Sequence, residues 1–173
     1  MKVVDVGHRI EELLEPMEGV RSYTTWQIDG DGREFVGVGD YDSQEVWKTA
    51  GAAVADSKIL DDVAESIDSM LEFRLVRIAQ VLGQRPENTV VGEFLSLTDR
   101  RADMGYGDDL EQELGRIMGE LSVIEGFIGA LYGRDNSSED EVLAVALWRR
   151  KFAFENSLPA GRPHDVRLYQ RIA

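Results

Sequence analysis

The segment from Leu110 to Gly133 reads LEQELGRIMGELSVIEGFIGALYG. Its large apolar residues recur at alternating intervals of four and three positions, the spacing of an apolar seam along one side of a helix. These residues are Leu110, Leu114, Ile117, Leu121, Ile124, Ile128 and Leu131. The pattern predicts one long helix over residues 108–133, and we expect the rest of the chain to pack around it.

Small residues form a second stripe beside that apolar seam. They are Gly115, Gly119, Ser122, Gly126 and Gly129. Each glycine inside a helix costs about 1 kcal/mol relative to alanine, so we expect a closely packed neighbour to offset the cost. The sequence leaves three neighbours open: the small-residue segment 50–55 of the same chain, a second copy of the chain, or a flat ligand lying in the groove.

Composition limits the classes of function. The chain has 173 residues and a formal net charge of −14, which is unsuited to binding nucleic-acid phosphates or anionic membranes directly. It contains no cysteine, which excludes disulfides and thiolate metal sites. No apolar run reaches the length of a membrane span, and the N-terminus lacks the apolar core of a signal peptide. We predict a cytoplasmic or virion-internal protein without a cofactor, and we find no internal repeat.

The first 42 residues predict a helix followed by a β-hairpin. The helix is expected to begin near Asp5 and to end before Pro16. β-Branched and aromatic residues then fill 20–28 and 35–38, with the turn signal Asp31-Gly32 between them.

The length of that turn sets the predicted register of the hairpin. With Asp31-Gly32 as a two-residue turn, Ile28 faces Phe35 and Trp26 faces Gly37.

Residues 43–156 predict a helical bundle. Apolar periodicity indicates helices over 44–55, 57–83 and 139–156, in addition to 108–133. Residues 89–97 suit a short helix or a buried strand, and we favour the helix. The last segment, 157–173, predicts an irregular basic tail. The predicted fold class is therefore mainly α, with one domain over residues 1–173: a bundle of four to five helices carrying a small N-terminal β-hairpin.

A row of carboxylates follows the predicted helix over 57–83. Asp61, Glu65, Asp68 and Glu72 are spaced at the repeat of one helix face. Three interpretations stay open: a solvated face, a docking site for a basic segment such as Arg149-Arg150-Lys151, or a divalent-metal site for phosphate chemistry.

Two short motifs resemble a known family. Glu113-Leu-Gly-Arg116 and Leu147-Trp-Arg-Arg-Lys-Phe152 resemble the second half of the all-α nucleotide pyrophosphohydrolases of the MazG type. The resemblance implies Mg²⁺ held between carboxylates on two helices. However, the family's paired-glutamate motif is absent upstream, and Arg116 stands where the family has a ligating aspartate. An arginine there would repel the metal, so we do not infer membership.

The sequence favours a non-catalytic, acidic interaction or assembly protein that self-associates through the helix 108–133. Its partner would be another protein or a second copy, which predicts a homo-oligomer. The first alternative is a divergent Mg²⁺-dependent all-α nucleotide pyrophosphohydrolase. Its carboxylates would be Glu65, Asp68, Glu72, Glu113 and Glu120. The second alternative is an acidic mimic of nucleic acid that inhibits a basic partner. For the favoured function we assign no catalytic residue and no metal ligand.

Overall fold

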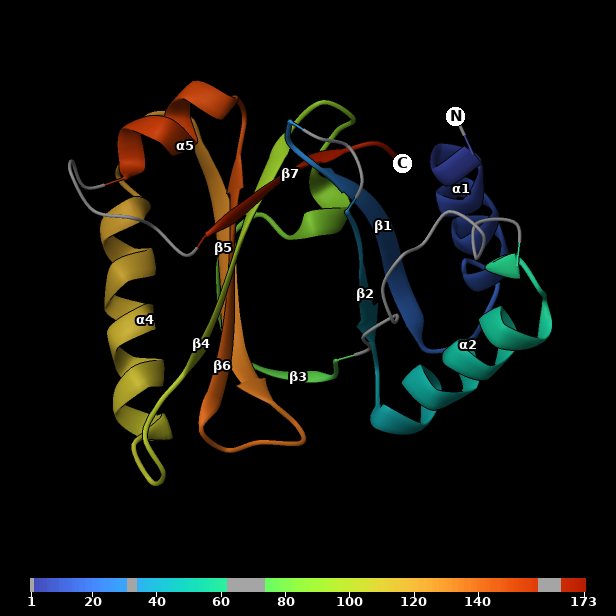
Figure 1. Ribbon diagram of the computed structural model, residues 1–173, viewed down its shortest axis with the longest axis horizontal. Coiled ribbons are helices and arrows are strands. Elements are labelled where there is room, and N and C mark those ends of the chain that lie inside the picture. The colour runs from blue at the N-terminus through green and yellow to red at the C-terminus, as the bar shows by residue number, and fades with distance from the viewer. Residues whose placement is uncertain (1, 31–33, 62–73, 159–165) are drawn as a thin grey trace.

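The computed structural model describes residues 2–30, 34–61, 74–158 and 166–173. Seven antiparallel strands form one curled sheet in the order β2-β1-β7-β4-β6-β5-β3. Helices α1 and α2 cover one outer side of the sheet, and α4 and α5 cover the other (Figure 1). The elements are α1 (Lys2–Leu14), β1 (Val20–Ile28), β2 (Phe35–Tyr41), α2 (Gln44–Asp56), β3 (Val76–Gly83), η1 (Pro86–Asn88), β4 (Phe94–Arg101), α4 (Gly107–Leu121), β5 (Phe127–Asp135), β6 (Glu141–Trp148), α5 (Lys151–Ser157) and β7 (Arg167–Arg171). The predicted mainly α bundle is therefore wrong.

The second half of the chain is a complete βαββαβ unit. Its elements run β4-α4-β5-β6-α5-β7, and its strands lie in the order β7-β4-β6-β5, which is the ferredoxin-like arrangement. The first half repeats the same succession as α1-β1-β2-α2-β3, without a described counterpart of β4. The molecule is thus an α+β protein built from two related halves.

The pairing of the strands shows that the halves are related by a pseudo-twofold axis. The last strand of each half pairs with a strand of the other half: β3 pairs with β5, and β7 pairs with β1. The first hairpin has a register shift between Val20 and Ser22, and the second has one at the corresponding place, between Phe127 and Gly129.

Backbone hydrogen bonds repeat in the same way. The Asp29 N–H donates to Leu168 O, and the Asn136 N–H donates to Leu75 O, both at 2.8 Å. The turn Met17-Glu-Gly-Val20 recurs as Ile124-Glu-Gly-Phe127, and the glycine of each turn has a positive φ, 84° and 91°. The prediction that the chain has no internal repeat is wrong.

Three apolar layers make up the core. The layer between the two halves contains Trp26, Leu95, Ile128, Val145, Leu147 and Tyr169. The layer under α4 and α5 includes Leu114, Met118, Trp148 and Phe154. The layer under α1 and α2 includes Val6, Ile10, Leu14, Ala50 and Ile59. Each helix therefore packs on the outer face of one half, while the inner faces pack on each other.

The predicted helix 108–133 is two elements. Helix α4 ends at Leu121, and strand β5 begins at Phe127. Gly126 lies in the intervening turn, where its positive φ disfavours other residues. On β5, Gly129 and Gly133 face the backbone of the crossing segment: an added Cβ would lie 2.1 Å from Gln84 O and 2.1 Å from Arg77 O, respectively. Gly129 and Gly133 therefore serve the close contact between β5 and the crossing segment, not the packing of a helix.

Four other helical or irregular assignments are also wrong. Residues 76–83, 94–101, 141–148 and 167–171 are the strands β3, β4, β6 and β7. Strands β4, β6 and β7 lie inside the sheet, and β6 is buried along almost its whole length. A strand covered on both faces loses the alternation of apolar and polar residues, so periodicity does not separate it from a buried helix.

Several N-terminal predictions are confirmed. Helices form over 2–14 and 44–56, the second capped by the Ser43 side chain, which accepts from the Val46 N–H at 3.3 Å. The two predicted strands pair as β1 and β2, but they belong to the large sheet, and their register differs by one residue. Trp26 faces Val36, and Gln27 faces Phe35. The predicted turn residues 31–33 lie outside the described residues. Among the described helices, none has the length and apolarity that crossing a membrane requires.

The close contact of β5 with β3 predicts opposite effects at two glycines. Gly133→Ala places a methyl group against backbone atoms of β3, so it should lower the free energy of unfolding by about 1–3 kcal/mol. Gly119→Ala is the matched control, because nothing lies within 4 Å of its added Cβ on α4; it should raise stability by up to about 1 kcal/mol. Denaturant unfolding of both variants checks the signs. A neutral Gly133→Ala would contradict the packing described for β3.

Candidate functional site

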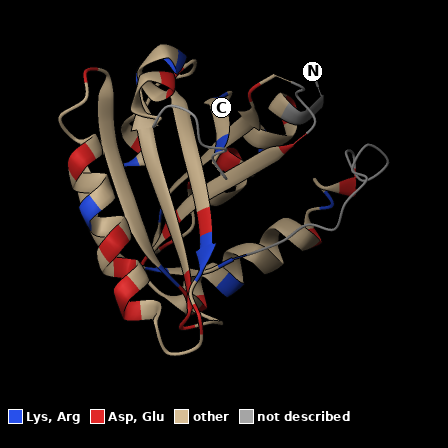
Figure 2. Ribbon diagram, turned by 60° about the vertical axis from the view of Figure 1, so that its left-hand side comes forward, with Lys and Arg blue, Asp and Glu red and all other residues tan. Residues whose placement is uncertain are grey.

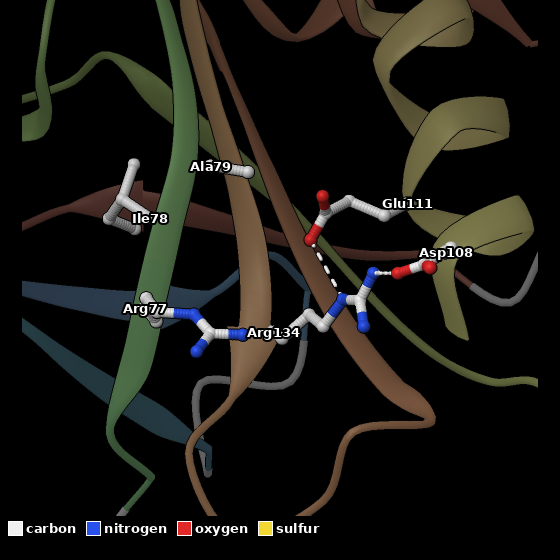
Figure 3. A pocket seen from close by; sticks show the side chains of 6 residues that line it. All are labelled: Arg77, Ile78, Ala79, Asp108, Glu111 and Arg134. Atoms are coloured by element: carbon white, nitrogen blue, oxygen red, sulfur yellow. Dashed lines mark hydrogen bonds and ion pairs between the residues drawn. The ribbon is translucent and has the colours of Figure 1, made fainter. Parts of the chain in front are cut away.

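A surface hollow of about 400 Å³ lies between α4 and the strands β3 and β5. Figure 3 shows the six lining side chains, with Arg134 directed at two carboxylates. The lining residues are Arg77, Ile78, Ala79, Asp108, Glu111 and Arg134.

The charges of this hollow neutralise one another. Arg134 donates to Asp108, to Glu111 at 3.0 Å and to Glu139 at 3.3 Å. Asp108 and, after it, Glu111 raise the pKa of its guanidinium. Arg77 lies 3.6 Å from Glu139. Carboxylates also occupy several turns of α4 (Figure 2). The cluster attaches α4 to β5, and each of its arginines already has a carboxylate partner.

A second candidate lies beneath α1, and its residues are here called the α1 site: Glu11, Tyr23, Thr25, Tyr41 and Arg171. Helix α1 lies very close to β1, because a Cβ added at Gly7 would be 2.7 Å from Thr25 Oγ1. Glu11 follows Gly7 by one helical turn and therefore points at the same strand. The buried residues of α1 and α2 pack around this polar group.

Two glycines on β2 make room for the tyrosines of the α1 site. An added Cβ at Gly37 would lie 2.0 Å from the Tyr23 hydroxyl, and one at Gly39 would lie 2.4 Å from the Tyr41 hydroxyl. The hydroxyl ends of both rings therefore occupy the space that side chains at positions 37 and 39 would fill. Between the glycines, Val38 turns to the opposite face and packs in the layer between the halves. The alternation Gly-Val-Gly thus gives one polar and one apolar face.

The α1 site holds polar atoms without partners. Glu11 Oε1 and Thr25 Oγ1 are buried and make no hydrogen bond of normal geometry among the described residues. Glu11 Oε2 lies 3.7 Å from His8 Nδ1, and the Glu11 side chain is 26% exposed. A buried oxygen without a partner costs free energy, and such atoms mark places where a ligand or water completes the bonding.

The protonation of these groups is shifted in a common direction. Burial raises the pKa of Glu11, against the opposing charges of Arg171 and His8. Burial also raises the pKa of Tyr23 to about 12, with further increases from the neighbouring Tyr41 and Glu11, whereas the adjacent Thr25 side chain lowers it. Burial raises the pKa of Tyr41 as well. At neutral pH the site therefore presents neutral phenols beside a carboxyl group whose proton affinity is increased.

Arg171 acts on the α1 site through its charge. Its guanidinium donates to Thr89 Oγ1 at 3.0 Å and to the Thr89 carbonyl, and its Nε donates to Ala173 O at 3.1 Å. These bonds hold the cation in place. It stays near enough to Glu11 to act on the charge of that carboxylate.

The corresponding place in the second half is apolar and filled. By the pseudo-twofold relation, Glu11, Tyr23, Thr25 and Tyr41 correspond to Met118, Ala130, Tyr132 and Trp148. All four of these counterparts are buried in the layer under α4 and α5. The polar atoms there are satisfied: Tyr132 donates to Gln80 Oε1 at 2.8 Å, and Trp148 Nε1 donates to Ser96 Oγ at 3.0 Å. The two halves share a backbone, but the first half alone has this group of polar residues under its helix.

The predicted contact face is not brought together as one surface. Gly115 lies on α4 against the Tyr132 hydroxyl, and Gly119 faces open space. Ser122 caps the end of α4, where its hydroxyl donates to Gly119 O at 2.6 Å. Gly126 is in the turn, and Gly129 lies on β5.

The predicted carboxylate stripe is described only at its first residue. Asp61 is exposed, whereas Glu65, Asp68 and Glu72 lie outside the described residues. The carboxylates of the hydrolase alternative on α4 face arginines: Glu113 lies 3.9 Å from Arg100, and Glu120 pairs with Arg116. In the described part of the chain, no group of three or more metal-ligating side chains occurs.

The residues of the α1 site were not identified from the sequence. Two signals point to them. The alternation Gly37-Val-Gly39 beside a strand bearing Tyr23 and Thr25 indicates room for aromatic rings over the glycines, and the recurring Glu-Gly turn reveals two halves whose corresponding residues differ.

Solved structures share this fold. A provisionally assigned monooxygenase of Fusobacterium nucleatum subsp. nucleatum aligns with a TM-score of 0.72 and 11% identity over 99% of this chain and 84% of its own. An anthrone oxidase-like protein aligns with a TM-score of 0.67 and 18% identity over 99% and 86%. A ferredoxin fold protein of Listeria monocytogenes, related to antibiotic biosynthesis monooxygenases, aligns with a TM-score of 0.56 and 12% identity over 95% and 88%. No protein-family model and no curated protein matches the sequence. At these identities the likeness shows the fold.

The comparisons correct the function favoured from the sequence. Self-association through a helix over 108–133 is contradicted, because that helix ends at residue 121 and the fold is that of monooxygenase-like proteins. The hydrolase alternative was inferred from an all-α family and is contradicted by the seven-stranded sheet. The nucleic-acid-mimic alternative was inferred from the acidic charge, and it is contradicted together with the favoured function by the comparisons. The homo-oligomeric state and the cytoplasmic location stay predictions.

The raised pKa of Tyr23 predicts a stability change at high pH. A phenol whose pKa is about 12 when folded and 10.0 when unfolded keeps its proton longer in the folded state. Stability is therefore fully present below pH 10 and is lost as pH rises through 12, by up to about 1.4 kcal/mol per pH unit. Tyr23→Phe should flatten this decline, as measured by urea unfolding between pH 9 and 12. An unchanged slope would contradict the burial of this hydroxyl.

Proposed function

We propose that this protein is an enzyme-like, small-molecule-binding protein that takes a planar aromatic carbon acid into the α1 site and removes a proton from it. Glu11 is the general base, and the neutral Tyr23 hydroxyl donates a hydrogen bond to the oxygen that gains charge. The observation that carries this assignment is the buried Glu11 Oε1, which has no partner among the described residues while its carboxyl group has a raised pKa.

The chemistry of the surroundings supports an aromatic ligand. The α1 site lies in an apolar layer that includes Ile10, Leu14 and Ile59, and the Tyr23 and Tyr41 rings supply aromatic neighbours for a planar ligand. Apolar walls with a few placed polar groups are typical of small-molecule sites. This protein shares its fold with an anthrone oxidase-like protein and with monooxygenase-like proteins. The shared fold supports, by analogy, an oxidation of the ligand after the proton is removed.

Anthrone provides a concrete reaction. Its methylene carbon loses a proton to Glu11, the resulting carbanion forms a C–O bond with O₂, and the peroxide anion takes a proton from solvent to become the hydroperoxide. Loss of water from the hydroperoxide then leaves a carbonyl, so that anthrone and O₂ yield anthraquinone and water. The carbon is oxidised, O₂ is reduced, and Glu11 returns its proton to solvent.

The test compares Glu11→Gln with Glu12→Gln, since Glu12 is the exposed neighbour on the same helix. Anthraquinone formation from anthrone in air is followed by absorbance. Removing the general base should lower the rate by about 10²-fold or more, whereas Glu12→Gln should leave it unchanged. Affinity for anthraquinone, measured by calorimetry, should stay within a few-fold in both variants.

Three results would count against all or part of the assignment. Equal rates in both variants would remove Glu11 from the reaction. Absence of anthraquinone binding would remove aromatic ligands of this shape altogether. Binding without turnover would leave a small-molecule-binding protein and exclude the oxidation.

A further inference from the structure

The outer edges of β2 and β3 are the two ends of the curled sheet. In the second half, β4 lies between β6 and β7 and pairs with both. Under the pseudo-twofold relation, β2 corresponds to β6 and β3 corresponds to β7. No strand among the described residues occupies the place that β4 would take in the first half, and this place is here called the strand slot.

One ion pair reaches across an end of the slot. Arg85 follows β3 and donates from Nη1 to Asp40 Oδ2 of β2 at 2.6 Å. One strand inserted between two others would separate them by about 9.6 Å, twice the usual spacing. The Arg85–Asp40 ion pair joins the β3 and β2 sides of the slot through side chains at this end.

Among the described residues, the backbone groups that face the slot have no backbone hydrogen-bond partner. The Ile28 N–H donates to Glu34 O, so the alternating ladder turns the N–H and C=O groups of Gly37 and Gly39 away from β1. The Gln84 N–H donates to Ile128 O, so the N–H and C=O groups of Val81 point away from β5. Unpaired edges of this kind are templates for an added strand.

The strand β4 shows what chemistry the slot accepts. Its Leu95 and Leu97 face the layer between the halves. Its Ser96 faces the other way, where the hydroxyl accepts from Trp148 and donates to Ala146 O. A strand in the slot would run antiparallel to both neighbours, with apolar residues alternating inward.

We propose that the strand slot binds an extended segment of a partner protein by strand addition. The segment is about eight residues long, carries large apolar residues at alternating positions, and pairs with β2 and β3 simultaneously. Because the slot borders Gly37 and Gly39, the bound segment would also lie beside the tyrosines of the α1 site. This inference does not depend on the proposed reaction.

The probe is a synthetic peptide with the sequence of β4, FLSLTDRR (residues 94–101), labelled for fluorescence anisotropy. We expect saturable binding, with hydrogen-exchange protection appearing in both 35–41 and 76–83. The control peptide has the same sequence with N-methylated backbone at alternate residues, which removes donors without changing side chains. It should bind at least about tenfold more weakly.

A matched pair of protein variants tests the edge itself. Val81→Pro removes one N–H that points into the slot, and Val81→Thr keeps that donor and the β-branched shape. Peptide affinity should fall in the first variant and persist in the second, with melting temperatures checking that both fold.

Three outcomes would overturn the proposal. They are no peptide binding at about 1 mM, the weak end of specific recognition; binding that N-methylation leaves unchanged; and protection limited to one strand or found elsewhere. A peptide-reversible dimer in analytical ultracentrifugation would likewise replace the partner segment with a second copy.

Discussion

The structure depends on the exchange of strands between its two halves. Strand β3 leaves the first half and pairs with β5, while β7 returns from the second half and pairs with β1. The β3–β5 contact is tight enough to require glycine at two positions of β5, where backbone carbonyls occupy the space of a side chain. With both exchanges in place, the inner faces of the halves meet around Trp26, Leu147 and Tyr169, all almost completely buried. Neither half could cover these surfaces alone.

The pseudo-twofold relation also explains how one backbone carries two different interiors. Under α4, small and aromatic residues fill the space, and the polar atoms of Tyr132 and Trp148 have partners. Under α1, a carboxyl group and two phenols occupy the corresponding place, and two oxygens lack partners. A filled apolar core favours stability, whereas unsatisfied buried oxygens reduce it and are retained where they bind something. This difference directs attention to Glu11 and Tyr23 more strongly than the open hollow near Arg134, whose charges are already paired.

Part of the fold could be predicted because its signals are local. Pro16 and the Ser43 cap end or begin helices by backbone chemistry that needs no distant partner. The first two strands are partly exposed, so their residue types identify them as strands. By contrast, the seam from Leu110 to Leu131 satisfies helix spacing only because a real helix, a tight turn and a buried strand follow each other without interruption. The central strand β6 is apolar on both faces, so its sequence does not distinguish strand from helix. The candidate site could not be predicted from the sequence. Glu11 looks like an ordinary surface residue and Tyr23 like an ordinary strand residue until α1 is placed on β1.

The sequence by itself determined the acidic charge, the absence of cysteine chemistry, the first two helices and the β1–β2 pairing. Each of these follows from composition or from neighbours a few positions apart. The tertiary structure decided the seven-stranded sheet, the strand exchange, the role of the β5 glycines and the α1 site. Those features arise from contacts between residues far apart in the chain, such as Gly133 with the backbone of Arg77 or Gly7 with the side chain of Thr25. Such contacts stabilise the protein only when both partners are in place, so no local pattern of residues predicts them.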